Sequence, residues 1–367
     1  MKYFPFMFAV AVLLSACTSS QPSGSIVGSE TSATDSLRYP AEKHLKNIRQ
    51  LTFGGDNAEA YFSFDSRYLV LQRAHPESGI PCDQIFFGKI PTAPGESFDL
   101  MPVSNGLGRT TCAYFLPGDS TIIYASTHLS ADTCPPSPDR AKIKKYVWPI
   151  YDSYELFVAD RQGNILRQLT DNDAYDAEAT VSPRGDKIVF TSTRNGDIDL
   201  YTMDIDGGNV QQITHELGYD GGAFFSPDGS KIIFRASRFK TEAAAGEYRE
   251  LLSQGLVAPT EMELYICNVD GSDLRAIAPL GKANWAPYFH PNGKKVLFSS
   301  NHTSETGRLF NIFMIGVDGS GLEQITFDDQ FDSFPMFSPD GRQLVFASNR
   351  NNGGTRETNV FIADWVD

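Results

Sequence analysis

Polar side chains recur at one position of the chain, six residues before the turn in each of six similar segments. The residues at this position are Asn57, Thr110, Asp176, Asp220, Asn284 and Asp332. In two of the segments a glutamate, Glu59 or Glu178, follows two positions later. If the segments surround one centre, these side chains form a ring. Carboxylate and amide oxygens in such a ring accept hydrogen bonds from a ligand and attract its positive groups.

Basic side chains recur at a second position, near the end of the strand that follows each turn. They are Arg73, His75, His128, Arg194, Arg235, Arg238, His302 and Arg350. A site that mixes carboxylates, imidazoles and guanidiniums suits a ligand with both charges, such as a peptide, or an acidic sugar with a metal ion. The candidate ligand-binding residues are Asp176, Glu178, Asp220, Asn284, Asp332, His75, His128, Arg194, Arg235 and His302. The alternative is structural, because Asp and Asn side chains often cap loop amides.

Two long insertions would lie beside this ring. Residues 127–153 and 238–260 each separate a second strand from a third. The first insertion contains Trp148 and Tyr151, whose flat rings suit stacking on a sugar or a peptide; the alternative is that they fasten the insertion to the scaffold. In the second insertion, residues 241–252 have the composition of a short helix.

One hairpin sequence repeats along the chain and positions these side chains. "FFSPDGSKIIF" at 224–234 returns as "MFSPDGRQLVF" at 336–346, and looser copies begin at Tyr61, Tyr114, Thr180 and Tyr288. Ser-Pro-Asp-Gly favours a tight turn, and the flanks are rich in aromatic and β-branched residues. A third strand and a short fourth strand follow the hairpins. With turns 44 to 66 residues apart, the pattern predicts an all-β fold, a six-bladed β-propeller of four-stranded antiparallel blades.

The last repeat, ending in "NVFIADWVD", has only three strands. A spare strand lies near the start, where "LKNIRQLTF" at 45–53 resembles "ILRQLTD" at 165–171. We predict that this N-terminal strand completes the last blade, because closing the ring leaves no open sheet edge. The propeller then comprises residues 44–367.

The start of the chain carries export signals. Lys2, an apolar stretch and Leu14-Ser15-Ala16-Cys17 are typical of a signal peptide over residues 1–16, too short to span a membrane. The ending resembles a bacterial lipobox, which implies lipid attachment at Cys17; an ordinary secretory signal is the alternative. Residues 17–43, Ser/Thr/Gly-rich after Cys17, are predicted to be a flexible tether. Since Thr18 rather than an aspartate follows Cys17, we expect a periplasmic protein attached to the outer membrane.

Charge and cysteine content limit the partners. With 45 acidic and 31 basic residues the net charge is −14, which argues against nucleic acid and against an anionic membrane surface. We expect a monomer that contacts the membrane only through its lipid. Cys82, Cys112 and Cys134 fall on one side of the ring, and the sequence does not decide which two pair; Cys112–Cys134 is favoured because both belong to the second blade. A three-thiolate metal site is the alternative.

The repeats, with their "RQLT" and "SPDG" signatures, resemble the TolB-type (WD-type) propeller family over roughly residues 44–367. This resemblance implies a propeller of the bacterial envelope that binds a protein or peptide. Only about 26 residues separate Cys17 from the first strand, too few for the α/β domain that precedes the propeller in TolB, so the chain resembles a lipoprotein form without that domain. Similar repeats occur in oligogalacturonate lyases, which hold a metal ion with several histidines.

Two functions follow. The first is a non-catalytic envelope protein that binds a protein or peptide through the face carrying the insertions, with no cofactor. The second is a metal-dependent polysaccharide lyase, for which His75, His128 and His302 would be the candidate ligands. No nucleophile–base pair or phosphate-binding loop is evident in the sequence, which favours the binding protein, although propellers assemble sites from separate blades.

Overall fold

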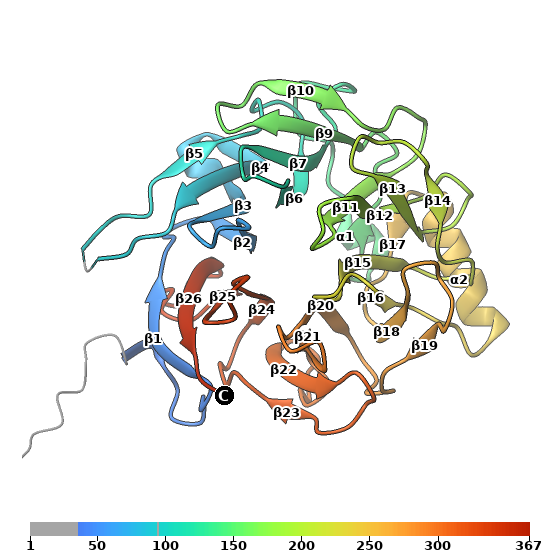
Figure 1. Ribbon diagram of the computed structural model, residues 1–367. Coiled ribbons are helices and arrows are strands. Elements are labelled where there is room, and N and C mark those ends of the chain that lie inside the picture. The colour runs from blue at the N-terminus through green and yellow to red at the C-terminus, as the bar shows by residue number, and fades with distance from the viewer. Residues whose placement is uncertain (1–35, 94) are drawn as a thin grey trace, which may run out of the picture.

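Six four-stranded antiparallel sheets stand in a ring around a central channel (Figure 1). The computed structural model describes residues 36–93 and 95–367. The expected signal peptide, Cys17 and residues 18–35 of the expected tether lie outside the described residues. Within the described part, no helix combines the length and the apolar composition needed to cross a membrane.

The blades follow one another along the chain. Blade I contains β2 (Asp56–Phe62), β3 (Tyr68–His75), β4 (Ile80–Lys89) and β5 (Leu100–Pro102). Blade II contains β6 (Thr110–Phe115), β7 (Thr121–Ser126), β9 (Glu155–Asp160) and β10 (Ile165–Gln168). Blade III contains β11 (Asp176–Val181), β12 (Lys187–Ser192), β13 (Asp199–Asp204) and β14 (Gln211–Gln212). Blade IV contains β15 (Asp220–Phe225), β16 (Lys231–Ala236), β18 (Glu263–Asn268) and β19 (Arg275–Ala276). Blade V contains β20 (Asn284–Phe289), β21 (Lys295–Ser300), β22 (Asn311–Gly316) and β23 (Glu323–Gln324).

Blade VI confirms the predicted ring closure. It contains β24 (Asp332–Phe337), β25 (Gln343–Ser348), β26 (Asn359–Trp365) and, as its outer strand, β1 (Leu45–Gln50). The two ends of the chain therefore share one sheet, in which Leu45 pairs with Trp365. Residues 37–44 also pack on this blade, where the buried carboxylate of Glu42 lies 2.9 Å from the Arg350 guanidinium.

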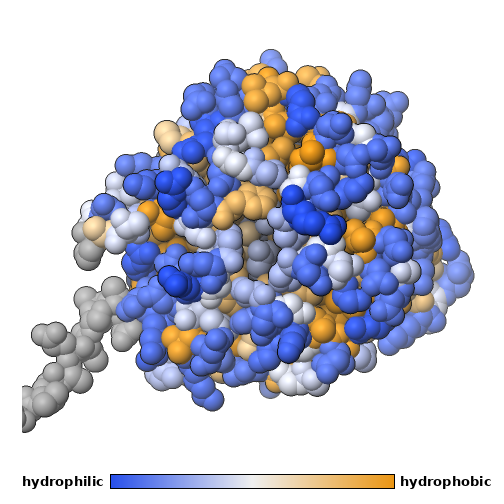
Figure 2. All heavy atoms as spheres, viewed as in Figure 1, coloured by the Kyte–Doolittle hydropathy of each residue, from blue (hydrophilic) through white to orange (hydrophobic). Residues whose placement is uncertain are grey.

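The repeated turn folds as its residues predict. In blade IV, Ser226 Oγ donates to Asp228 Oδ1 (2.6 Å) and accepts from the backbone N–H of Lys231 (2.9 Å). Gly229 has φ +71°, a conformation that costs glycine little. The strand that follows is wholly buried from Ile232 to Phe234. Each blade thus packs an apolar layer against its neighbours and leaves its turn in solvent, and Figure 2 shows a largely hydrophilic surface with separate hydrophobic spots.

Every inner strand carries a β-bulge at the same place. The pairing register shifts between Ala58 and Tyr61 in blade I and at the equivalent step in the other five blades. One residue in each bulge has positive φ: Glu59, Cys112, Glu178, Gly222, Ala286 and Phe334. All six line the cavity in the channel. The bulge therefore determines which side chain of each blade faces the centre.

The two insertions meet on one face of the ring. The first, residues 127–153 and here named the strap, contains α1 (Arg140–Ile143) and β8 (Trp148–Pro149). The second contains α2 (Glu242–Ser253), in agreement with the predicted helix, and β17 (Leu256–Val257). The hydroxyl of Thr241 caps α2 by accepting from the N–H of Ala244. β8 pairs with β17, so insertions from blades II and IV join across blade III.

The recurrent polar position is paired with a residue 18 positions later in the chain. Three blades carry aspartate and arginine there: Asp176–Arg194, Asp220–Arg238 and Asp332–Arg350, each in an ion pair with a fully buried aspartate. The other three blades carry Asn57, Thr110 or Asn284, followed by His75, His128 or His302. The interpretation of Asp176, Asp220, Asp332 and Arg194 as ligand-binding residues is therefore not supported by their contacts, because these residues already hold the hairpins of their blades together.

Replacing Asp176 by asparagine tests this structural role. Arg194 Nη2 donates to both carboxylate oxygens of Asp176, at 2.9 and 3.0 Å. Removing the charge from a fully buried acceptor should lower the free energy of unfolding by about 1–3 kcal/mol, measured by urea denaturation. Asp173→Asn, on the exposed turn before β11, is the matched control and should leave stability unchanged. An Asp176→Asn protein as stable as the wild type would contradict the structural role and restore the binding interpretation.

Candidate functional site

A cavity of about 490 Å³ lies in the channel beneath the strap. The bulge residues form its wall, and strap residues Tyr146 to Tyr151 cover it. Its charged lining residues are four carboxylates and two guanidiniums: Asp56, Glu59, Asp83, Glu178, Arg109 and Arg235. The cavity therefore has an excess of acidic groups, with aromatic rings around them.

Aromatic side chains close the channel below the bulges. Tyr61, Tyr114, Phe224 and Tyr288 follow the bulges of four inner strands by two residues. The ring centroids of Tyr61 and Phe224 are 5.6 Å apart, and those of Phe224 and Tyr288 are 5.1 Å apart, both in edge-to-face contact. Such contacts contribute about 0.5–1.5 kcal/mol each beyond the burial of apolar area. These rings therefore form an aromatic layer beside the cavity, and two of them, Tyr61 and Phe224, also line it.

Glu178 and Arg235 form an ion pair in the wall of the cavity. Arg235 Nη2 contacts Glu178 Oε1, and both residues are buried. Glu178 also accepts from Thr191 Oγ1 (2.8 Å), from the Tyr219 hydroxyl (2.9 Å) and from the N–H of Gly222 (3.0 Å). The Nε of Arg235 has no hydrogen-bond partner among the described residues. This nitrogen is itself enclosed by the protein, so it is an unsatisfied buried donor rather than one exposed to the cavity.

Two adjacent glycines make room for this ion pair. A Cβ atom on Gly221 would clash with Glu178 Oε2, and one on Gly222 would clash with Arg235 Nη1. Gly222 also has φ +61° at the bulge. Because blade IV has no side chain at its bulge, the guanidinium of Arg235 takes the place that a side chain occupies in the five other blades.

Glu59 and Cys112 form a second polar contact, between the bulges of blades I and II. The thiol of Cys112 donates to Glu59 Oε2 at 3.0 Å, and the Tyr61 hydroxyl lies 3.4 Å from the same oxygen. Burial is the main cause that raises the pKa of Glu59 to about 7, and the nearby Glu178 raises it further. Burial and the neighbouring Glu59 also raise the pKa of the Cys112 thiol, which therefore stays protonated.

The strap brings its aromatic rings onto the Glu178–Arg235 pair. The Arg235 guanidinium carbon lies 5.4 Å from the Trp148 ring centroid, within cation–π distance. Trp148 also contacts Trp285 of blade V, with ring centroids 5.2 Å apart. Tyr151 lines the cavity while its hydroxyl donates to the carbonyl of Pro136 (2.8 Å). The predicted site residues Glu178, Arg235, Trp148 and Tyr151 are therefore brought together in one cavity.

The three candidate histidines are not brought together. His75, His128 and His302 belong to blades I, II and V, and none of them lines the cavity. Each ring nitrogen Nδ1 hydrogen-bonds to a serine in its own blade: Ser78, Ser126 or Ser300. Asn284 shares this arrangement, because Ser300 Oγ also donates to its Oδ1. The three histidines occupy the positions that Arg194, Arg238 and Arg350 occupy in the other blades, and their hydrogen bonds indicate a role in blade packing.

The residues present do not fit a metal centre. Among the described residues, no group of three or more His, Cys, Asp and Glu is arranged to hold a metal ion. Arg235 and Arg109, which line the cavity, are themselves paired with the acidic groups Glu178 and Asp83. We therefore assign no metal-dependent step to this cavity.

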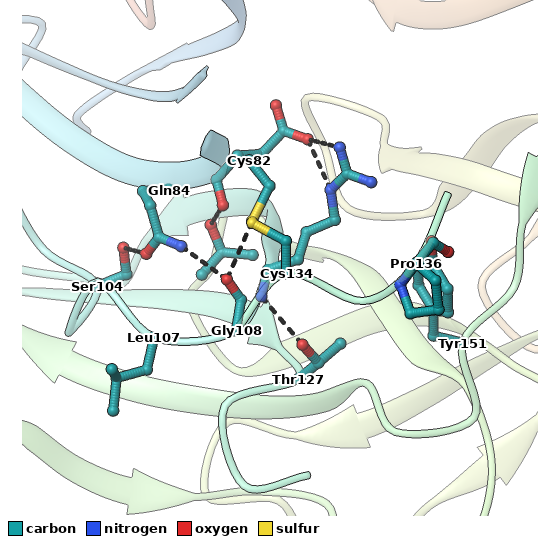
Figure 3. The surroundings of a disulfide bond; sticks show 12 residues. Cys82, Gln84, Ser104, Leu107, Gly108, Thr127, Cys134, Pro136 and Tyr151 are labelled. Atoms are coloured by element: carbon teal, nitrogen blue, oxygen red, sulfur yellow. Dashed lines mark hydrogen bonds and ion pairs between the residues drawn. A yellow bond between two sulfur atoms is a disulfide. The ribbon is translucent and has the colours of Figure 1, made fainter. Parts of the chain in front are cut away.

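The cysteine prediction was wrong. Cys82 of β4 forms a disulfide with Cys134 of the strap (Figure 3). Cys112 has a free thiol and lines the cavity. The bridge joins blade I to an insertion of blade II, so adjacency around the ring, rather than membership of one blade, decides the pair. It leaves only one thiol of the three, which overturns the three-thiolate alternative. The bridge fastens one end of the strap, and the β8–β17 pairing fastens the other.

Most of the cavity wall was not predicted from the sequence. Cys112 stands two residues after Thr110, as Glu59 and Glu178 stand two residues after Asn57 and Asp176. Extending that offset to every repeat would have identified the whole bulge ring. No such spacing identifies Tyr219 and Trp285. They stand next to the recurrent polar residues Asp220 and Asn284, and in the sequence they look like ordinary core aromatic residues.

The comparisons agree with this architecture. A search of the curated proteins found no match. The family model described as "TolB beta propeller domain" matches residues 136–256, from the strap through blade III into the second insertion. A structure of a putative TolB from Agrobacterium tumefaciens is similar, with a TM-score of 0.55 and 19% identity over 85% of this chain and 91% of that one.

Two further solved structures were found to be similar. An oligogalacturonate lyase from Vibrio parahaemolyticus gives a TM-score of 0.51 at 11% identity, over 88% of this chain and 94% of that one. TolB from Acinetobacter baumannii gives a TM-score of 0.49 at 16% identity, over 84% of this chain and 63% of that one. Because identities this low show the fold alone, they carry no activity to this chain. The chain is therefore a β-propeller whose residues 136–256 match the model described as "TolB beta propeller domain", and its fold is similar to that of a putative TolB.

Proposed function

We propose that this chain is a non-catalytic envelope protein that binds a peptide segment of a partner in the cavity beneath the strap. The observation that carries the proposal is the Arg235 guanidinium, which lies in the cavity wall among carboxylates and aromatic rings. A peptide carbonyl or carboxylate would accept a hydrogen bond from the part of this guanidinium that lines the cavity. The excess of carboxylates in the same lining would attract positive groups of the peptide.

The shape of the cavity supports an extended chain rather than a bulky domain. The strap and the aromatic layer below the bulges limit the space to about 490 Å³, which suits a few residues. Trp148, Trp285 and Tyr219 provide rigid aromatic surfaces, which favour peptide contacts because few rotamers are lost on binding. Since the aromatic rings and the Glu178–Arg235 pair are already fixed, binding requires little reorganisation of the wall.

The second candidate, a metal-dependent lyase, finds no favourable observation in the described site. The histidines proposed for it are packed in separate blades. The fold similarity to a lyase is shared with TolB and does not distinguish the two. We therefore retain the binding function.

The proposal includes the envelope location. The sequence Leu14-Ser15-Ala16-Cys17 supports a signal peptide followed by a lipidated cysteine, and the acidic propeller would be held at the outer membrane by lipid alone. TolB-like repeats are consistent with the periplasm. The structure describes neither Cys17 nor its surroundings.

Replacing Cys17 by serine tests the anchor. The wild-type protein expressed in a Gram-negative host should incorporate a labelled fatty acid and sediment with membranes, because several acyl chains hold firmly. The Cys17→Ser protein should lose the label and appear in the soluble fraction. Cys267→Ser, at a buried thiol within the propeller, is the control and should keep the label. Cys17→Ser protein that remains with the membranes after a salt wash would contradict the lipid anchor.

Replacing Arg235 by methionine tests the binding function. A random peptide library displayed on phage is selected on the purified propeller, and the affinities of enriched peptides are measured by fluorescence anisotropy. We expect Arg235→Met to weaken these peptides by about tenfold or more, because a charge-assisted hydrogen bond is lost in the cavity. Arg308→Met, at an exposed arginine of blade V, should bind as the wild type does. If no peptide is enriched, or if the enriched peptides bind Arg235→Met unchanged, the proposed function is wrong.

A further inference from the structure

The two carboxylates at bulges of the cavity wall differ in their partners. Glu178 is compensated by the Arg235 guanidinium and by three further hydrogen-bond donors. Glu59 makes no ion pair with any described residue; its partners are the Cys112 thiol and the Tyr61 hydroxyl. A carboxylate that is withdrawn from water without a counter-ion is costly, and a bound cation reduces that cost.

The charges around Glu59 add to this imbalance. Asp83 and Arg109 form an ion pair at 3.0 Å, and Glu178 is paired with Arg235. Both guanidiniums of the lining are therefore already paired, which leaves Asp56 and Glu59 as its two uncompensated carboxylates. Asp56 is exposed at the rim, whereas Glu59 lies deeper in the wall. The interior of the cavity lacks one positive charge.

Tyrosine rings line the same cavity as this carboxylate. Tyr61 follows it by two residues, and Tyr154 and Tyr175 line the same cavity within electrostatic reach of Cys112. The rings of Tyr154 and Tyr175 contact each other edge to face, with centroids 5.7 Å apart. The faces of tyrosine rings attract cations, and a carboxylate beside them adds hydrogen-bond acceptors for an ammonium group.

We infer that Glu59, with the surrounding tyrosines, is a subsite for a primary ammonium group, such as a lysine side chain or a free N-terminus of the bound peptide. The inference rests on the proposed peptide-binding function and adds the chemical class that the cavity selects. An ammonium group provides three donors, and the carboxylate of Glu59 is the acceptor without a competing cation. Arg235 at the other polar contact would hold a peptide carbonyl or carboxylate, so the cavity recognises both charges of one ligand.

The subsite gives binding a defined pH dependence. The titratable groups around Glu59 are Tyr61, Asp83, Cys112, Glu178 and Arg235. The pKa of Glu59 is raised to about 7, so the neutral acid predominates below that pH and the carboxylate above it. Tyr61 and Cys112 have pKa values raised well above their usual ranges and stay neutral. The ammonium group of a lysine side chain keeps its proton until about pH 10, so its binding should strengthen as the pH rises through about 7.

The test uses n-butylammonium, which matches the end of a lysine side chain, and 1-butanol as the uncharged control of similar size. Binding to the purified propeller is followed by NMR titration at about pH 8 and about pH 5.5. We expect saturable binding of butylammonium at the higher pH, weakened about tenfold or more at the lower pH, and no saturable binding of butanol. Glu59→Gln should abolish the binding, while Glu305→Gln, at an exposed glutamate of blade V, should leave it unchanged.

Three results would overturn the subsite: equal binding of butanol, unchanged binding by a folded Glu59→Gln protein, or binding independent of pH. The wild-type pH series decides the matter even if Glu59→Gln fails to fold. The outcome is also separable from that of the peptide selection. If peptides bind through Arg235 but butylammonium does not bind, the subsite is wrong and the proposed function stands. If butylammonium binds through Glu59 and no peptide is enriched, the proposed function is wrong and the subsite stands.

Discussion

The β-bulge in each inner strand is the constraint on which the site depends. A regular strand would alternate its side chains between the two faces of its blade, and none would be aimed along the channel radius. The bulge places one residue in a left-handed conformation and turns it to the centre, in all six blades. Blades I to III use this position for Glu59, Cys112 and Glu178, whereas blades IV to VI carry Gly222, Ala286 and Phe334. The cavity therefore has a polar half and an apolar half, and only Arg235 brings charge to the second.

The strap converts this polar channel into a covered cavity. The Cys82–Cys134 disulfide holds one part of the strap, and the pairing of β8 with β17 holds the aromatic segment that contains β8 over the bulges. Trp148 can then pack on Arg235 and Trp285 at once. This shielding from water strengthens the Glu178–Arg235 interaction and raises the cost of a carboxylate without a counter-ion, as at Glu59. The strap thus stabilises Glu178, which is paired with Arg235, and makes an ionised Glu59 costly unless a cation binds beside it.

Much of the fold could be predicted from the sequence, because it depends on local signals that repeat. Three local signals predicted elements that the structure contains. The Ser-Pro-Asp-Gly turns predicted the hairpins, the spare strand at 45–53 predicted the outer strand of the last blade, and the stretch at 241–252 predicted the helix α2. The site was harder, since its residues come from different blades and insertions. Position along the repeat does not reveal that Asp176 or Asp220 forms an ion pair with the arginine 18 residues later, so the prediction that these residues and Arg194 bind a ligand stays untested. The disulfide was not predicted because Cys82 and Cys134 belong to neighbouring blades, and only the arrangement of the blades in a ring brings them together.

The measurement that tests the account most directly is hydrogen–deuterium exchange of the propeller with and without a peptide selected for binding. If the cavity beneath the strap is the binding site, protection should concentrate in residues 146–151 of the strap and in the inner strands around Glu59, Cys112 and Glu178. The Ser-Pro-Asp-Gly turns on the opposite face should exchange as in the free protein. Protection confined to those turns or to the outer strands, with none in the strap, would contradict the account.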